Sequence, residues 1–567
     1  MRAWVLFTLI TAPVLAWAAQ TDSPLVGYVP DPRGRGTPSL LVSCILTLIV
    51  CVWSALHLNV PPRTQSTSRN ILLNAQWIIA GIYAPEMVVF VAWRQWSSAR
   101  LLQKMITEAA DGKAGPSTDW TMTHSFFACT GGFAFEFDEL DLVQDAEQDR
   151  EAMPTPRLTL TARGVALLAR CGHLPHVPRE EIDDKSKANS LAKATVLLQA
   201  TWMLIQAVGR LIAGLPVTLL EVNTVAHVLC ALSMYMLWWH KPLLPQQPII
   251  LRDKELIPLA TFMYSSSEMS GYLNPTRVRS QTWIKTLFAH LSLYSKTPEL
   301  ETLCIRTTFD SQMPREGNPS PRKKTGSLPT VSGTTFFQQA PNDCLAILQA
   351  QRQKETGTAF FERRPRVLDQ GTKPSVASKR RWSNLAIAID TYPQLMQHDR
   401  LLLRHHFGRA NCVHLKPEQL MVDHVGNWPS SDLLRDVDGL VVGMVLWLAN
   451  FVYGGIHMAA WNDHFPTEAE KWLWRGSSSY IAFCGGLWVV LNFAVSRIPK
   501  LNEFWEHWMD GKRYLAQSIT LGIVVFICGL SLVFARVFIV VEAFIGIREM
   551  PTSVYATVEW TDILPHF

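Results

Sequence analysis

The stretch TVLLQATWMLIQAVGRLIAGLPVTLLEVNTVAHVLCALSMYMLWW, residues 195–239, decides the fold. It holds two predominantly apolar runs, 195–213 and 217–239, separated by a short break. A helix needs about 20 apolar residues to cross the hydrocarbon core of a bilayer. Because hydrocarbon cannot hydrogen-bond a peptide group, such runs must close their hydrogen bonds internally as helices. The stretch therefore predicts two consecutive membrane-spanning helices.

Further apolar runs of spanning length lie on both sides of this pair. They are residues 40–60, 71–93, 438–460, 478–496 and 513–545. The composition agrees, since 48% of the 567 residues are apolar and only 17% are charged, against about 25% charged residues in soluble domains. We therefore predict an all-α, polytopic helical membrane protein with about seven spans after a signal peptide.

The first 19 residues have the composition of a signal peptide. Arg2 precedes an apolar run, and the small residues Ala16, Ala18 and Ala19 follow it. We expect this segment to be cleaved, because the run is shorter than a spanning helix needs; the alternative is a short first membrane anchor. The expected location is the endoplasmic reticulum or another endomembrane.

Two long connections divide the predicted spans. The N-terminal membrane half, residues 20–240, holds four spans and a loop at 94–194. A basic, partly disordered loop follows at 241–437, and residues 438–567 form a C-terminal membrane half with three spans. The basic loop contains 26 Lys plus Arg and 17 Asp plus Glu, a net charge of +9, whereas the whole chain carries +5.

Two arguments disagree on the side of the membrane where the basic loop lies. The excess of Lys and Arg favours the cytosol. A cleaved signal peptide followed by four spans would place the loop in the lumen. An extra span or an uncleaved signal peptide would reconcile the two arguments, so the sequence leaves the topology open.

The segment SFFACTGGFAFEF, residues 125–137, is apolar but too short to cross a membrane. The Gly131–Gly132 pair interrupts it. It is either a buried loop or the tip of a re-entrant hairpin, and we favour the re-entrant hairpin.

Ionisable side chains within apolar runs are the candidate functional residues, because each costs a few kcal/mol to insert into a membrane. Glu86 follows Pro85, which interrupts the helical hydrogen bonds beside the carboxyl group. A carboxylic acid in an apolar pocket stays protonated and can donate its proton. Glu86 is therefore the first candidate general acid, with Glu221 and Glu542 in reserve.

Structural roles compete with these assignments. Glu86 could instead pair with Arg536 or hydrogen-bond a neighbouring helix, and Glu221 could be an ordinary structural acid near the membrane surface. Arg536 and Glu542 are six residues apart and on different helix faces, so we expect each to reach another helix.

Several kinds of site are not indicated by the sequence. It has no Walker loop, no GxGxxG motif after a strand, no HEXXH and no GxSxG. DDKSK at Asp183 and DVDG at Asp436 each lack an acid of the known cyclase motifs. The ten cysteines form no CxxC pair, and the His and Cys residues at 171–176 and 405–414 have no standard metal-ligand spacing. We therefore expect no metal, no cofactor and no nucleic-acid partner.

Several strings resemble a large family of multispanning proteins of filamentous fungi. They are CILTLIVCVWSALHLNVP (44–61), IAGIYAPEMVVFVAW (79–93), WTMTHSFFACTGGFAF (120–135), the stretch from DDKSK to WWHKP (183–242), ARVFIVVEAF (535–544), VYATVEW (554–560) and ILPHF (563–567). Most members of this family have no assigned activity. A few are similar to membrane-bound terpene cyclases of meroterpenoid pathways, of the macrophorin type, which protonate the prenyl chain of a farnesylated polyketide.

This resemblance implies a lipid-soluble prenylated substrate, contact with membrane lipids and cooperation with other pathway enzymes. Such chemistry needs an acid, a dry cavity and aromatic faces that stabilise a carbocation. The candidate substrate-binding residues are Trp53, His57, Trp77, Trp202 and His227. Trp238 and Trp239 suit interfacial anchoring better. The competing hypothesis is a non-enzymatic receptor, transporter or scaffold.

Overall fold

The protein is described here from a computed structural model. Apart from residues 32–33 and 244, it describes residues 23–54, 57–63, 67–111, 119–136, 157–185, 190–267, 439–501 and 515–558. Shorter pieces between residues 303 and 433 are described as well. The predicted signal peptide and most of the predicted basic loop lie outside the described residues.

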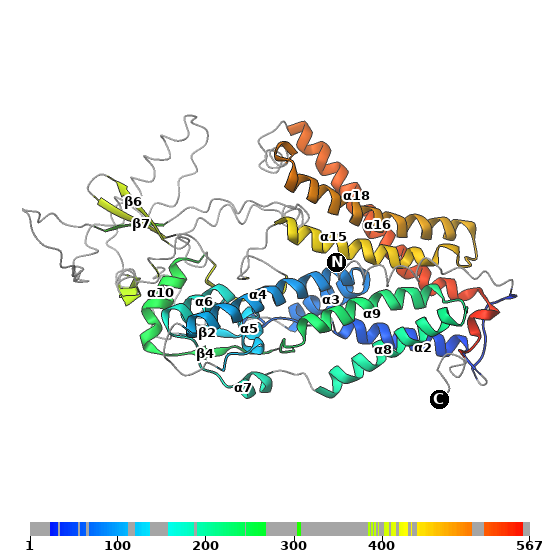
Figure 1. Ribbon diagram of the computed structural model, residues 1–567, viewed down its shortest axis with the longest axis horizontal. Coiled ribbons are helices and arrows are strands. Elements are labelled where there is room, and N and C mark those ends of the chain that lie inside the picture. Colours follow the sequence, from blue (N-terminus) through cyan, green and yellow to red (C-terminus); the bar gives the residue numbers. More distant parts are fainter. Residues whose placement is uncertain are drawn as a thin grey trace, which may run out of the picture.

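Long helices run mainly along the longest axis of the molecule and form a bundle (Figure 1). They are α2 (Thr37–Ser54), α3 (Thr67–Tyr83), α4 (Pro85–Asp111), α8 (Ser190–Ile212), α9 (Leu219–Trp238), α15 (Gly439–Met458), α16 (Glu468–Arg497) and α18 (Leu515–Ile545). Helix α9 is the central one, because it contacts α2, α4, α8, α15 and α18. The prediction of a mostly helical protein is confirmed.

Five described helices are long and apolar enough to cross a membrane. These candidate spans are Ala194–Ile212, Leu219–Trp238, Gly443–Asn462, Glu468–Arg497 and Phe526–Arg548. The apolar part of α2, Thr37–Trp53, is shorter. The run predicted at 71–93 is not one straight span, because α3 and α4 meet at a bend of 111° beside Pro85. The described residues thus hold five candidate spans, or six if the bent pair is one, rather than seven.

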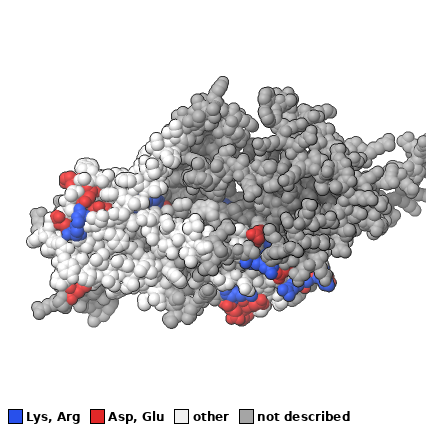
Figure 2. Space-filling view, turned by 180° about the vertical axis from the view of Figure 1, so that it is seen from behind, with Lys and Arg blue, Asp and Glu red and all other residues white. Residues whose placement is uncertain are grey.

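The outer surface of the bundle is apolar along its length. Exposed large apolar side chains include Val42, Leu46 and Ile49 on α2, Leu198, Ile205 and Ile212 on α8, Phe483 and Val490 on α16, and Phe526 and Leu530 on α18. Between residues 80 and 197, no large apolar side chain of the described part is exposed. Figure 2 shows charged side chains gathered towards the two ends of the described surface. This distribution suits hydrocarbon around the middle of the bundle and water at its ends.

One end of the bundle carries a small mixed domain, which we name the sheet end. Its helices are α5 (Met122–Cys129), α6 (Ala162–Cys171), α7 (Arg179–Asp184), η1 (Lys254–Leu256) and α10 (Ile257–Ser265). Its strands are β2 (Phe133–Phe135), β3 (Leu158–Leu160), β4 (Ile249–Leu251) and β8 (Met421–Val422). They form a sheet in the order β4-β2-β3-β8, with β2 and β4 parallel and the other pairs antiparallel.

Residues 125–136 of the segment 125–137 belong to this domain, so they form the buried segment of the two alternatives and not the re-entrant hairpin that we favoured. Its first part lies in α5 and its second part forms β2, and the side chains from Ser125 to Phe135 are buried. Gly131 makes the turn between them with φ of +78°, which favours glycine. A Cβ atom on Gly132 would lie 2.4 Å from the Phe127 ring. The glycine pair therefore allows a tight helix-to-strand turn.

The opposite end, which we name the termini end, joins the two ends of the described chain. Strands β1 (Leu25–Val26) and β9 (Met550–Pro551) pair antiparallel. The short helices η3 (Ala459–Asn462), η4 (Gly546–Arg548) and η5 (Thr552–Tyr555) also belong to it. The Thr37 and Tyr555 hydroxyls, 2.8 Å apart, form a buried hydrogen bond.

A separate three-stranded antiparallel sheet has the order β5-β7-β6, with β5 at Leu303–Thr307, β6 at Leu402–Phe407 and β7 at Ala410–Leu415. Together with the sheet end, this sheet adds β-structure to the all-α fold that the sequence predicts. Short strands of this kind are hard to predict because their apolar runs are only a few residues long.

Candidate functional site

Glu86 forms an ion pair with Arg536 inside the bundle. Glu86 lies in the first turn of α4 and Arg536 in α18, and both are buried. Arg536 Nη2 lies 2.5 Å from Glu86 Oε1, and Nη1 lies 3.2 Å from Oε2. Both carboxylate oxygens therefore accept a hydrogen bond from the guanidinium. The structure thus shows the pairing that competes with the acid role for Glu86.

Other groups complete the shell around this pair. Arg536 donates to the carbonyl oxygen of Tyr83 at 2.7 Å and to the side-chain oxygen of Asn450. Asn450 in turn donates to the carbonyl of Ile481 at 2.8 Å. The guanidinium also lies 5.1 Å from the ring centre of Tyr453. Four helices, α3, α15, α16 and α18, are therefore tied to the first turn of α4.

His227 has a structural surrounding as well. Its Nδ1 lies 2.8 Å from the carbonyl of Asn223, one turn earlier in α9, and its Nε2 lies 2.9 Å from the carbonyl of Ile82 in α3. The side chain of Asn223 reaches His457 Nε2 at 3.3 Å. Both ring nitrogens of His227 thus face main-chain oxygens, which leaves neither directed at a substrate.

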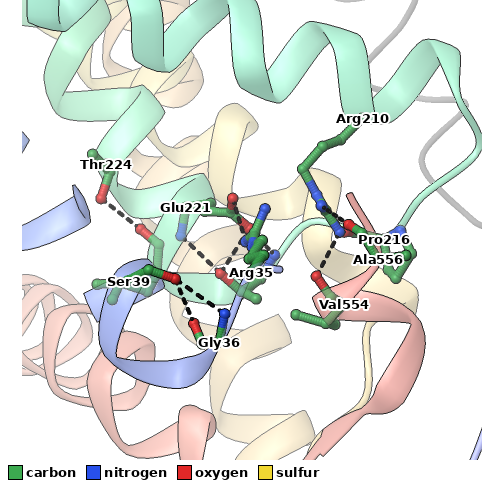
Figure 3. Close-up of polar contacts among 11 residues, drawn as sticks. Arg35, Gly36, Ser39, Arg210, Pro216, Glu221, Thr224, Val554 and Ala556 are labelled. Carbon is green, nitrogen blue, oxygen red and sulfur yellow. Dashed lines mark hydrogen bonds and ion pairs between the residues drawn. The ribbon is translucent and has the colours of Figure 1, made fainter. Parts of the chain in front are cut away.

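Glu221 caps helix α9. Its Oε2 accepts hydrogen bonds from the Thr218 amide and hydroxyl, both at 3.0 Å, and the Thr218 hydroxyl accepts from the Glu221 amide. Its Oε1 lies 2.6 Å from Arg35 Nη2 (Figure 3). This is a capping box with an added ion pair. These contacts give Glu221 a structural role as a buried helix cap.

Arg210 fastens the termini end beside this cap. It donates to the carbonyl oxygens of Pro216, Val554 and Ala556 at 2.7 to 3.0 Å (Figure 3). The segment after β9 is thereby held against the loop between α8 and α9.

Glu542 differs from the other two predicted acids because no cation pairs with it within the described residues. It lies in α18 and is 3% exposed, and its Oε1 has no hydrogen-bond partner. The described charges that act on its carboxyl group are those of Glu470 and Arg548. Arg548 Nη2 lies 2.5 Å from Glu470 Oε1 and so pairs with that acid. Within the described residues, Glu542 is therefore a buried carboxyl group that no cation pairs with directly.

Asp463 is a fourth acid that the sequence reasoning missed. It follows η3 in the turn WNDHFP, and its Oδ2 is buried without a hydrogen-bond partner. Burial and the nearby Glu221 carboxylate raise the pKa of Asp463 to about 8. Asp463 is thus mainly protonated at neutral pH. The search for acids within apolar runs omitted it because it lies just after a span.

Glu221, Asp463, Glu470 and Glu542 all lie at the termini end, where Glu221 acts electrostatically on Asp463 and Glu470 acts on Glu542; we name these four acids the carboxylate cluster. Arg35 and Arg548 pair with Glu221 and Glu470 and neutralise them. Asp463 and Glu542 have no cationic partner in the described part of the chain. A Cβ atom on Gly546 would lie 3.8 Å from Glu542 Oε1 and 3.2 Å from Leu219, which places Glu542 beside the start of α9. Asp463 and Glu542 are therefore the two acids of the cluster that have no ion-pair partner among the described residues.

The predicted substrate-binding residues are not brought together. Trp53 and Trp202 are 56% and 46% exposed on the outside of the bundle. Trp77 is partly buried against the core. His57 is buried with its ring stacked on Trp238 at 4.9 Å, so Trp238 is not an exposed anchor, whereas Trp239 is 52% exposed.

Lys241 is a buried amine at the junction of the bundle and the sheet end. Its Nζ donates to the His57 carbonyl and, at 2.8 Å, to Gln95 Oε1, and it lies 4.5 Å from the ring centre of Trp238. No carboxylate pairs with it in the part of the chain that is described. Burial lowers the pKa of Lys241 to about 7.

Among the described residues, no group of three His, Cys, Asp or Glu side chains could hold a metal ion. The chain matches the model of a family of unknown function, DUF8562, over residues 4–326 and 358–567. Because the match covers most of the chain, the protein belongs to this family. No curated protein and no solved structure matches the chain.

Proposed function

We propose that the protein is a membrane-bound terpene cyclase of fungal secondary metabolism that protonates the prenyl chain of a farnesylated polyketide. The observation that carries this proposal is the Glu542 carboxyl group, which is buried with an unpartnered oxygen while the neighbouring arginine pairs with another acid. A buried carboxyl group without a counter-charge is more stable in its protonated form. Glu542 is therefore the proton donor in this proposal, in place of Glu86.

The proposed reaction is an isomerisation. The Glu542 proton adds to a double bond of the prenyl chain and leaves a carbocation, which the next double bond attacks. Each ring closure converts one π bond into a carbon–carbon σ bond. Loss of one proton from the final carbocation to a base restores the mass of the substrate. The reaction as written consumes no cofactor.

Aromatic side chains near the carboxylate cluster support this chemistry. Phe465 follows Asp463 by two residues, and its ring centre lies 6.0 Å from that of the buried Trp474. Trp474 also lies 5.9 Å from the His457 ring. Aromatic faces attract a carbocation by about 0.5 to 2 kcal/mol each. The turn between α15 and α16 thus offers both acids and aromatic rings.

A non-enzymatic membrane protein is the second candidate. The closed network around Glu86 and Arg536 favours it, because every member is satisfied by another protein group. Such networks hold helices together without any reaction. In that case the carboxylate cluster would have no substrate.

The experiment is an assay in membranes from a host that lacks such a pathway. Microsomes that contain the protein receive a farnesylated phenolic polyketide, and the product is analysed by mass spectrometry and NMR. We expect an isomer of equal mass with fewer double bonds. The Glu542→Gln variant, which keeps the shape of the side chain, should lower the rate by about 10² or more.

Glu468→Gln is the matched control, because Glu468 lies at the same end of the bundle but is exposed and pairs only with Lys471. It should keep the full rate. Unchanged turnover by Glu542→Gln would reject Glu542 as the proton donor. Asp463→Asn would then be the next variant to assay. Absence of any isomer from prenylated substrates, with folded protein in the membranes, would reject the cyclase proposal.

A further inference from the structure

Helices α3 and α4 change direction inside the bundle. The bend between them is 111°, and because this exceeds 90°, α4 turns back towards the side from which α3 came. Tyr83 and Glu86 stand at the bend, where both contact Arg536. Arg536 lies within the candidate span Phe526–Arg548. The bend is therefore inside the bundle and not at its surface.

Both arms of this pair connect to the sheet end. Before α3, the Asn59 amide donates to the Asn427 side chain at 2.7 Å, and Arg63 pairs with Glu136 at 2.6 Å. Within α4, Ser98 contacts Cys129 of α5, and α4 also packs against α6. The chain thus enters and leaves the pair at the same end of the molecule.

The remaining helices run between the two ends. Helix α2 begins beside Tyr555 at the termini end, and the chain after it reaches the sheet end at Asn59. Helix α8 ends two residues after Arg210, which binds the segment after β9 at the termini end. Helix α9 begins at the same end and leads to Lys241 at the sheet end. If the shorter helix α2 also crosses, α2, α8 and α9 make three crossings between the start of the described chain and β4, and not the four that the sequence predicts.

Basic residues are concentrated at the sheet end. After α9 the chain carries Lys241, Arg252 and Lys254 at the sheet end, and the segment 241–437, whose described flanks lie in the sheet end, contains 26 Lys plus Arg. At the termini end, the connections 213–218 and 459–467 contain no Lys or Arg, and Arg35 and Arg548 each pair with an acid. Lys and Arg within about 15 to 20 residues of a span are retained on the cytosolic side of membranes, and Lys241, Arg252 and Lys254 lie within this distance of α9.

We infer that α3 and α4 form a re-entrant hairpin and that the sheet end faces the cytosol, with its basic residues beside the anionic lipid leaflet. The carboxylate cluster then faces the lumen. This assignment also reconciles the basic loop with a cleaved signal peptide, since three crossings place the loop in the cytosol. The inference rests on the membrane location assumed in the proposed function.

Cysteine labelling in sealed, cytosol-side-out microsomes tests this inference. Arg63→Cys and Lys104→Cys report the two arms of the hairpin, and Glu468→Cys reports the termini end; these side chains are 44%, 71% and 75% exposed. A membrane-impermeant maleimide should label the first two without detergent and the third only after permeabilisation. The unsubstituted chain gives the background from its own cysteines.

Each other labelling pattern overturns one part of the inference. Labelling of Arg63→Cys and Lys104→Cys from opposite sides would show that α3 and α4 cross the membrane. The reversed pattern for all three would show that the sheet end faces the lumen. Release of the protein by alkaline carbonate would instead reject the membrane location, and with it the proposed function.

Discussion

Arg536 shows how a single buried cation organises its neighbours. Its guanidinium binds the Glu86 carboxylate, the Tyr83 carbonyl and the Asn450 side chain, and it lies over Tyr453. Breaking a buried ion pair costs more than the pair contributes, because the remaining charge is left uncompensated. The ion pair between Glu86 and Arg536 therefore affects stability mainly when one of its two partners is removed.

We expect Glu86→Gln and Arg536→Met each to lower the free energy of unfolding by about 3 to 5 kcal/mol. The double variant Glu86→Leu with Arg536→Met should recover a large part of this loss, because neither charge is then buried. Unfolding in detergent micelles, followed by circular dichroism, measures the effect. Glu468→Gln, in an exposed pair with Lys471, should change the same quantity by less than about 0.5 kcal/mol. Single variants as stable as this control would contradict the structural role.

At the scale of the elements, α15 and α16 pack through two glycines. A Cβ atom on Gly454 of α15 would lie 2.5 Å from the Ala482 nitrogen, and one on Gly485 of α16 would lie 2.5 Å from the Phe451 nitrogen. Backbone atoms cannot move out of the way as a side-chain end can. Small residues allow this close approach of helices inside a membrane.

Gly454→Ala and Gly485→Ala should therefore separate the two helices and destabilise the protein by about 1 to 3 kcal/mol. Gly455→Ala is the matched control, because nothing lies within 4 Å of its added Cβ atom. It should be neutral or stabilise the helix by up to about 1 kcal/mol. Midpoint temperatures of unfolding in detergent compare the three variants. An equal effect at Gly454 and Gly455 would show that the close packing is not needed.

At the scale of the whole molecule, Lys241 joins the bundle to the sheet end. Through Gln95 and the His57 carbonyl, it connects the end of α9 to α4 and to the chain after α2. Because burial lowers its pKa to about 7, the unfolded chain binds this proton more tightly than the folded chain. The contribution of Lys241 to stability therefore rises with pH from about 7 to the ordinary lysine value near 10.4.

The stability of the protein relative to its Lys241→Met variant should accordingly increase between pH 7 and pH 9.5. Unfolding temperatures measured across this range test the prediction. Lys104→Met, which changes an exposed lysine, should follow the pH dependence of the unsubstituted protein. Parallel curves for the protein and Lys241→Met would show that the buried amine does not titrate in this window.

Much of the architecture can be predicted from local sequence. Long apolar runs determine α8, α9, α15, α16 and α18, because hydropathy and helix length are properties of neighbouring residues. The break before Glu86 is visible in Pro85. The short strands of the sheet end cannot be predicted in this way, because β2 pairs with β4 and β3 pairs with β8, which lie far from them in the sequence.

The sequence by itself determined the helical bundle and a short list of buried acids, because the cost of placing charge or peptide groups in hydrocarbon depends only on local composition. Only the tertiary structure decided the state of those acids. Glu86 has its arginine 450 residues away in the sequence, Glu221 has Arg35, and Glu542 has no counter-charge in the described chain. Whether a carboxyl group is neutralised depends on which helices meet, and that follows from packing of the whole bundle.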